Sequence, residues 1–392
     1  MEKKKWEPKK VSLSAAIIVG GLVALLGVVI GLNWHNLFGG QLFNSVSYQV
    51  DWSSLDEVYN RLASSYNGEI DKQALIDGAK AGVVEALGDI YTVYMNAEKG
   101  EEFYDDLHGN VGSGIGVEIG KRDGYIRVLR TLPDNPARRA GVLAGDIIYK
   151  VNGEEVWDLG TDEMSKKLRG ETGSEVTVTV VRDGKELDFT MTREKLNNVS
   201  AYVNYDGKTA IITVTRFDNN TGTEIQKMAQ EFASKGVNKV ILDLRGNGGG
   251  YVSAAKDLLS LWIDGEKVYE QKSKHYGDAV VNADRGKALL KDMKTIVLIN
   301  GSTASASEIV AGALQDYGKA TIIGEQSYGK GVVQNLFNLY NGGLLKVTTA
   351  EWLTPKGTSI NKEGITPDKI VERSYEDINK MRDPQMDAAK GL

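Results

Sequence analysis

A charged tail followed by a long apolar stretch divides this chain into a part inside a membrane and a part outside it. Residues Val11–Leu32 contain no charged side chain, and two serines are their only polar ones. As a helix, this stretch would be about 33 Å long, enough to cross a hydrocarbon core about 30 Å thick. Five lysines in the first ten residues predict a cytoplasmic N-terminus. We therefore expect residues 1–33 to form a cytoplasmic tail and a transmembrane anchor, with the rest outside the cytoplasm.

A cleaved signal peptide is the alternative interpretation of the same stretch. Its apolar region should be shorter, about 7–15 residues, and a small-residue cleavage site should follow. The residues after Leu32, NWHNLFGGQLFNS, contain no such site. The sequence therefore favours an uncleaved, single-pass anchor in the cell membrane.

The scarce residue types exclude several kinds of chemistry. The chain has no cysteine and three histidines, at positions 35, 108 and 275. Disulfides, thiolate metal sites and cysteine nucleophiles are thereby excluded, and the scattered histidines form no paired zinc signature. We expect no metal site. An isoelectric point near 5.4 without a basic domain argues against nucleic-acid binding.

Residues 34–108 form a region with a helical pattern from Trp52 to about Leu107. Leu55, Val58 and Leu62 recur at the spacing of one helix face. A region this small buries little apolar surface alone. We expect it to pack on a later domain or on a second subunit.

Residues 109–194 have a β-rich pattern, with short alternating strands separated by Gly, Asp and Asn turns. The run GIGV at 114–117 and the run NPARRAGVLAGDIIYKVNG at 135–153 together resemble a PDZ domain. In that family, backbone N–H groups of the glycine loop bind the C-terminal carboxylate of a peptide, which adds as a strand. The resemblance implies that Ile115, Gly116 and Val117 bind peptide.

Residues 195–392 have an α/β pattern. Apolar strands are expected at Ala210–Val214, Val237–Leu244, Thr295–Ile299 and Ala320–Ile323, with helices at 252–262 and 309–317 between them. This alternation predicts βαβ units around a buried parallel sheet. The fold class expected for the whole chain is multidomain α+β.

Ser305 lies just before the second of these helices, which is expected to begin near Ala306, and two interpretations of it remain open. Ser305 and Glu308 fit a capping box, so the serine can be a simple N-cap. The same position also suits a nucleophile, because the free amides of a helix N-terminus can stabilise an oxyanion.

Lys330 is the candidate base, because no histidine lies nearby. It is flanked by Gly329 and Gly331, which allow a close approach to a site. A buried lysine can act as a general base when its pKa falls toward neutrality. Gln334, four residues on, would return to the same face of a helix or strand and orient the amine. The alternative is that both are surface residues.

These residues together resemble the C-terminal processing peptidases, which are serine peptidases with a Ser-Lys dyad. The resemblance covers residues from about 50 to 372. It rests on the run TASASE at 303–308, on YGKG at 328–331, on Gln334, and on DLRGNGGG at 243–250. It implies that Ser305 is the nucleophile, Lys330 the base and Gln334 the residue that orients it.

The glycine loop at 243–250 is expected to supply the oxyanion hole in such a peptidase. The resemblance implies the amides of Gly249, or of Gly248, together with that of Ala306. This sequence has Gly248 where the family usually has proline, so the donor is not fixed by the motif. The loop lacks the Walker and GxGxxG spacings, which argues against phosphate binding.

The resemblance also implies a crotonase-like peptidase core, a homodimer, no organic cofactor, and protein or peptide substrates with accessible C-termini. Arg169, in the PDZ region, is either a link between peptide binding and the active site or an exposed arginine at a helix end. A catalytically silent PDZ scaffold at the membrane and a crotonase-type acyl-CoA enzyme are the rival interpretations.

Overall fold

The chain forms two units, residues 1–72 and 73–392, and each is considered by itself. The computed structural model describes residues 50–110, 112–122, 124–196, 198–340, 342–380 and 382–392. In the first unit, helix α3 (Ser53–Ser65) has no buried residue. The expected anchor Val11–Leu32 lies outside the described residues, and no helix within them is long and apolar enough to span a membrane.

The second unit begins with a mixed segment rather than the purely helical one expected. Helix α4 (Lys72–Glu85) has no buried residue, strand β1 (Val93–Met95) follows, and then helix α5 (Ala97–His108). Strand β1 pairs with the distant strand β18 (Leu344–Leu353) in antiparallel register. The helical pattern did not reveal β1, because three residues are too few for a periodicity to appear.

The PDZ-like region is an antiparallel sheet with two helices. Its strand order is β3-β4-β5-β7-β8, so β3 is an edge strand. Helices α6 (Pro136–Ala140) and α7 (Thr161–Leu168) pack with it, and the buried residues form one apolar cluster. The strands are β2 (Ser113–Gly114), β3 (Val117–Arg122), β4 (Tyr125–Thr131), β5 (Ile147–Val151), β6 (Glu154–Glu155), β7 (Glu175–Arg182), β8 (Lys185–Thr192) and β9 (Glu194–Lys195).

A six-stranded sheet, ordered β10-β11-β12-β15-β16-β19, is the centre of the remaining chain. β10 is antiparallel to β11, and the following pairs are all parallel, as the sequence predicted for the four strands it identified. The strands are β10 (Ala201–Asp206), β11 (Thr209–Val214), β12 (Lys239–Asp243), β15 (Lys294–Ile299), β16 (Thr321–Gly324) and β19 (Lys369–Ile370).

Both faces of this sheet are covered, which explains the continuous apolar runs of its strands. In β12, Val240 and Leu242 join the cluster under helices α8 (Thr221–Gln230), α9 (Val252–Leu259) and α10 (Ala306–Asp316). Ile241 points the other way, into a cluster with Ala389 of helix α12 (Pro384–Gly391). A short helix, α11 (Tyr375–Asn379), precedes α12.

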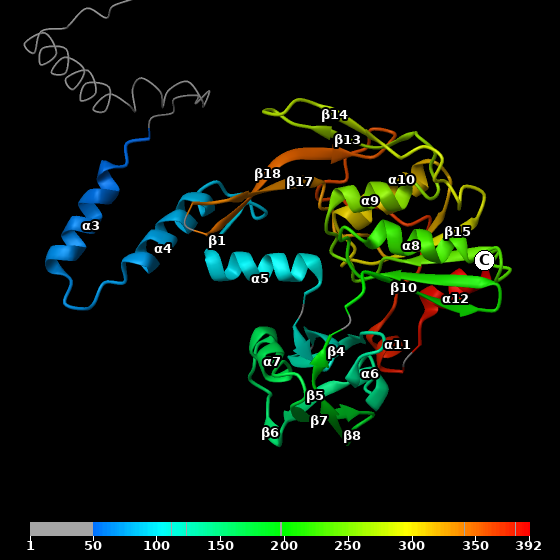
Figure 1. Ribbon diagram of the computed structural model, residues 1–392, viewed down its shortest axis with the longest axis horizontal. Coiled ribbons are helices and arrows are strands. Elements are labelled where there is room, and N and C mark those ends of the chain that lie inside the picture. The colour runs from blue at the N-terminus through cyan, green and yellow to red at the C-terminus, as the bar shows by residue number, and fades with distance from the viewer. Residues whose placement is uncertain (1–49, 111, 123, 197, 341, 381) are drawn as a thin grey trace, which may run out of the picture. The chain divides into compact units, whose positions relative to one another are not determined.

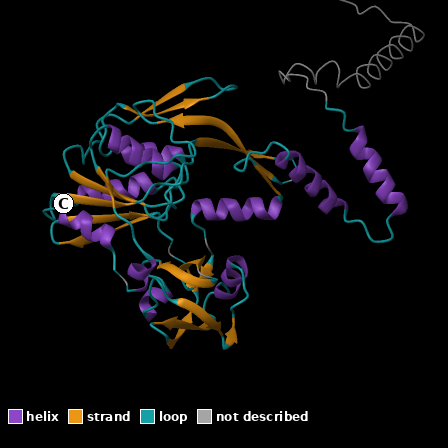
Figure 2. Cartoon of the chain, turned by 180° about the vertical axis from the view of Figure 1, so that it is seen from behind, coloured by secondary structure: helices purple, strands orange, loops and turns teal. Residues whose placement is uncertain are grey.

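A second sheet lies on the far side of helices α9 and α10 (Figure 1; Figure 2 gives the view from behind). It consists of β1, β18, β13 (Lys267–Lys272), β14 (Ala279–Asn282) and β17 (Val332–Asn338), with β17 paired to β18. Its buried Tyr269 and Trp352 share the main core with the helices. The helices thus lie between two sheets, and the residues between β16 and β18 run from one sheet to the other.

Candidate active site

Two loops meet at the carboxyl ends of β12 and β15, because these strands are parallel neighbours. Asn247, in the glycine loop, joins them. Its carbonyl oxygen accepts from Ala304 N and from Ser307 Oγ, both at 3.0 Å, and its side-chain Nδ2 donates to Val214 O at 2.9 Å. The side chain of Asn247 is almost fully buried. The turn that carries Ser305 is therefore fixed against the glycine loop.

Ser305 has a backbone conformation that a residue with a Cβ rarely adopts. Its φ is 57° and its ψ is −118° at the N-cap of α10. Such a conformation costs on the order of 1–3 kcal/mol and persists only where the surroundings impose it. Here the buried carboxylate of Glu308 accepts a hydrogen bond from Ser305 N at 2.7 Å.

The capping box expected of Ser305 and Glu308 is present at the start of α10, but at the serine end the hydrogen bond goes to the backbone and not to the hydroxyl. Glu308 accepts from Ser305 N, but the side chain of Ser305 makes no cap hydrogen bond. The amide of Glu308 donates instead to the backbone carbonyl of Ser305 at 2.8 Å. The serine hydroxyl is consequently left available for chemistry, which favours the nucleophile interpretation over the N-cap.

Glu308 also holds the loop that carries Lys330. Its Oε2 accepts from Lys330 N at 2.9 Å, and its Oε1 accepts from Ser327 Oγ at 2.6 Å and from Gly329 N at 2.7 Å. The carbonyl of Lys330 accepts from the indole Nε1 of Trp352 at 3.0 Å. One buried carboxylate thus fixes the backbones of both candidate catalytic residues.

The glycines beside Lys330 are required by close packing, as the sequence suggested. A Cβ on Gly329 would lie 2.9 Å from Glu363 N, and one on Gly331 would lie 2.6 Å from the Asn361 side chain. Neither distance is tolerable for a real Cβ. Lys330 can therefore approach the site only because both of its neighbours lack a side chain.

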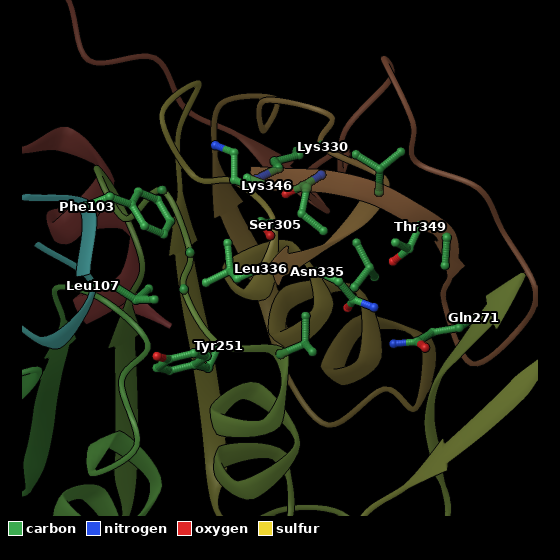
Figure 3. Close-up of a pocket in the computed structure, with 18 of the residues that line it drawn as sticks. Phe103, Leu107, Tyr251, Gln271, Ser305, Lys330, Asn335, Leu336, Lys346 and Thr349 are labelled. Carbon is green, nitrogen blue, oxygen red and sulfur yellow. The ribbon is translucent and has the colours of Figure 1, made fainter. Parts of the chain in front are cut away.

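Ser305 and Lys330 line one cavity of about 1020 Å³. Figure 3 shows Ser305 at its centre, with Lys330 and Lys346 on one side and Phe103 and Leu107 of α5 at one end. No hydrogen bond joins Ser305 Oγ to Lys330 Nζ among the described residues. Within the same residues, no cluster of His, Cys, Asp or Glu suited to a metal ion occurs.

Burial lowers the pKa of Lys330 from its ordinary value of 10.5 to about 8. The positive charge of Lys346 contributes in the same direction, whereas the negative charge of Glu308 opposes it. An amine with this pKa is about one-tenth neutral at pH 7, against less than about one part in a thousand for an ordinary lysine, which favours a role as general base.

The two expected oxyanion donors differ in this structure. Ala306 N belongs to the first turn of α10, whose amides have no intrahelical acceptor, and no described residue accepts from it. Gly249 N donates to Asn247 Oδ1 at 2.9 Å. As an oxyanion donor, Gly249 would have to release that bond. Its own position is tight, since a Cβ there would lie 2.8 Å from Ala304 O.

Gln334 lines the cavity, but the periodicity argument that placed it beside Lys330 is wrong. Lys330 precedes β17 in a loop, and the register of β17 shifts between Val333 and Gln334. A common face of one helix or strand therefore does not exist for the pair. Gln334 Nε2 is buried without a hydrogen-bond partner, and no hydrogen bond links Gln334 to Lys330.

The PDZ-like region has its own groove, of about 440 Å³, lined by residues 114–119, Leu168 and Arg169. Ile115 is buried, Gly116 has a φ of 77°, and Val117 begins the edge strand β3. Arg169 follows α7 with its side chain exposed, as an arginine at a helix end would be, and it also lines this groove. No ion pair joins Arg169 to another described residue.

Sequence reasoning missed three residues of the site. Glu308 was predicted only to cap the helix. Its position three residues after the candidate nucleophile could have suggested a role in fixing the site. Asn247 could have been identified from its position within the glycine loop. Tyr91, whose ring lies 5.5 Å from Lys330 Nζ, was not linked to the base, because it is distant from Lys330 in the sequence.

The chain matches three known protein families. Residues 208–371 match the profile described as "Peptidase family S41", residues 113–192 match "PDZ domain", and residues 41–99 match "Activating protease CtpB N-terminal domain".

Relatives and solved structures agree with these profiles. A protein of Staphylococcus saprophyticus named a CtpA-like serine protease is 31% identical over 369 residues, which is 94% of this chain and 74% of that protein. One of Staphylococcus aureus with the same name is 35% identical over 84% of this chain and 67% of its own length. The solved photosystem II D1 C-terminal processing protease has a TM-score of 0.56 at 28% identity, covering 82% of this chain and 87% of that one.

Proposed function

The chain belongs to peptidase family S41 and is a serine-type peptidase, as its motifs predicted, and from this premise we propose that it cleaves peptide bonds with a Ser305–Lys330 dyad. The observation that carries the proposal is the bridge formed by Glu308, which fixes both residues at one cavity. Membership of this family also favours an enzyme over the silent scaffold and over an acyl-CoA enzyme.

In the proposed reaction, neutral Lys330 accepts the hydroxyl proton of Ser305 as Oγ attacks the substrate carbonyl. The developing oxyanion is stabilised by the Ala306 amide, with Gly249 as a second donor once it leaves Asn247. Lys330 then returns the proton to the leaving amine, and water hydrolyses the acyl-enzyme by the same base. Lys330 Nζ must approach Ser305 Oγ, a tightening that substrate binding commonly produces.

Protein substrates follow from a peptidase with a PDZ domain, and we propose that the groove beside β3 captures their C-termini. An edge strand has free backbone groups to which a peptide can add. Gly116 suits the carboxylate loop, because a Cβ there would lie 2.3 Å from Asn135. Arg169 at the mouth of this groove is the proposed partner for the carboxylate charge.

We propose further that the enzyme is anchored by Val11–Leu32 and is a homodimer. The first rests on the uncharged apolar stretch after five lysines. The second rests on apolar side chains that recur along α3 and are exposed, namely Leu55, Val58, Tyr59 and Leu62. Resistance of the protein to carbonate extraction from membranes would support the anchor, and a monomeric mass by sedimentation equilibrium in detergent would refute the dimer.

The dyad is tested with the full chain in detergent and dye-labelled β-casein, a partly unfolded protein. We expect Ser305→Ala and Lys330→Met to abolish cleavage. Ser302→Ala and Lys356→Met, which change exposed residues, are the matched controls and should leave it unchanged. Fragments from Ser305→Ala identical to those of the wild type, at a similar rate, would show that another residue is the nucleophile.

A further inference from the structure

A second lysine, Lys346, lines the cavity that contains Ser305 and Lys330 (Figure 3). It lies on β18 directly across from Leu336 of β17, which also lines the cavity. The proposed reaction assigns it no role. A buried lysine costs free energy unless something compensates it, so its presence beside the base needs an explanation.

The segment before the PDZ domain fixes Lys346. Its Nζ lies 5.4 Å from the centre of the Phe103 ring, a distance at which the ring attracts a cation. Strand β1 pairs with β18 so that Val93 is opposite Lys346. The ammonium is thus held on a paired strand and against an aromatic face, rather than extended into solvent.

Asp89 helps to keep this lysine charged. Asp89 accepts from Thr92 Oγ1 at 2.6 Å, and Thr92 Oγ1 accepts from Thr348 N at 3.0 Å, which ties the aspartate to β18. Burial lowers the pKa of Lys346 from its ordinary value, and the negative charge of Asp89 opposes that lowering. Lys330 has a different surrounding, with the ring of Tyr91 5.5 Å from its Nζ.

We propose that Lys346 is a positioning residue for catalysis, whose fixed ammonium disfavours a second positive charge in the cavity and thereby increases the neutral fraction of Lys330. The proposal rests on the Ser305–Lys330 dyad proposed above. Two ammonium groups in one low-dielectric cavity repel each other strongly, and the more deeply buried one loses its proton first. Lys330 is the more buried of the two.

The other charged and titratable groups around the cavity do not reverse this effect. They are Asp89, Tyr91, Asp106, Arg216, Tyr251, Tyr276, Glu308 and Tyr328. The charge of Glu308 opposes the lowering of the Lys330 pKa, and its carboxylate accepts four hydrogen bonds. Burial raises the pKa of Tyr91 and of Tyr251, so both phenols stay neutral near neutral pH.

The titration of Lys330 can be measured without relying on activity. We would acetylate the full chain in trace amounts with acetic anhydride between pH 6 and 11 and quantify the Lys330 peptide by mass spectrometry. The wild-type midpoint is expected near 8. In Lys346→Met and Lys346→Gln, it should rise by about one pH unit, which makes cleavage of labelled casein about tenfold slower at pH 7.

Three comparisons separate this electrostatic role from a structural one. Lys346→Arg keeps the charge and should restore a midpoint near that of the wild type. Lys227→Met removes an exposed lysine on α8 and should change nothing. At pH 10, Lys346→Met and Lys346→Gln should cleave casein at a rate within about twofold of the wild type. A merely structural role of Lys346 would instead lower the cleavage rate at pH 10 as well.

An unchanged Lys330 midpoint in both neutral variants would overturn the proposal, whatever their activity. Full casein cleavage by Lys330→Met would instead show that the dyad is wrong, a result that does not depend on the acetylation data. A neutral variant that loses casein binding, seen as a raised KM with an unmoved midpoint, would assign Lys346 to substrate recognition and also refute the positioning role.

Discussion

Glu308 is the residue on which the geometry of this site depends most, and Glu308→Gln is its sharpest test. The side chain is fully buried and accepts hydrogen bonds from two donors at each oxygen. Glutamine has nearly the same shape but has only one oxygen. Whichever way the amide is turned, two of the four donors lose their acceptor and face an NH₂ group instead.

The expected loss of stability follows from this count. A buried donor left without an acceptor costs about 1–3 kcal/mol, and more where the lost acceptor was charged. Two such donors predict a loss of about 3–5 kcal/mol in the free energy of unfolding, after some relief from burying a neutral group. This is a large part of the roughly 5–15 kcal/mol that holds a domain folded.

Catalysis should be affected as well as stability, because Ser305 N and Lys330 N are two of the four donors. Without the hydrogen bond from Ser305 N to Glu308, the backbone of Ser305 can relax from its strained conformation, and the hydroxyl then moves away from its catalytic position. We expect casein cleavage to fall at least 10²-fold even where the variant is folded. Loss of the negative charge should also move the acid limb of activity to lower pH, since Glu308 raises the pKa of Lys330.

Urea unfolding followed by tryptophan fluorescence measures the stability, and casein cleavage measures the rate. Glu363→Gln is the matched control, because it makes the same chemical change at an exposed residue of the neighbouring loop. It should alter stability by less than about 0.5 kcal/mol. If Glu308→Gln lost less than 1 kcal/mol and kept its cleavage rate, the carboxylate would not be the element that fixes the two catalytic residues.

Two further predictions concern the oxyanion loop and the base. Gly249→Ala should reduce kcat about 10²-fold, because its Cβ would lie 2.8 Å from Ser305 Cβ at a φ of 105°. Gly248→Ala, whose Cβ meets nothing within 4 Å, should change it less than about threefold, and equal losses in both variants would contradict this assignment. Lys330→Met should be more stable than the wild type at pH 7, by about 2 kcal/mol after allowing for partial solvent exposure, because its amine titrates at about 8 when folded against 10.5 when unfolded. Between these two pH values the unfolded wild type binds more protons than the folded one, so the stability of the wild type rises with pH. The stability advantage of Lys330→Met should therefore shrink toward pH 10. Urea unfolding of both proteins at pH 7 and pH 10 measures this difference, and a difference that grows with pH would contradict the lowered pKa.

The parts of the site that follow a buried strand could be predicted from the sequence. Ser305 comes just after β15, and the glycine loop comes just after β12, so parallel pairing brings them together at one edge. Lys330 was identifiable from the two glycines that flank it, and packing around Gly329 and Gly331 explains why both are needed. Local sequence carries such information because the constraint and its cause lie within a few residues.

Other parts could not be predicted, because their partners are distant in the chain. Strand β1 has three residues, and its pairing with β18 joins positions about 250 residues apart. No periodicity in the sequence therefore predicts either the strand or its pairing. The spacing argument for Gln334 failed for a related reason. It assumed one continuous element from Lys330 to Gln334, whereas a loop and a register shift intervene.

The environment of the base is therefore built by segments on both sides of the PDZ domain in the sequence. Residues 89–103 supply Tyr91 beside Lys330 and Phe103 beside Lys346, while β18 supplies Lys346 itself. Because β1 is only three residues long, few hydrogen bonds hold the earlier segment to β18. A displacement of that segment would expose Lys330 and Lys346 to water and raise the pKa of the base, because burial is the main cause of its lowering. Any event that moves residues 89–103 would thus reduce activity at neutral pH without touching Ser305 or Lys330.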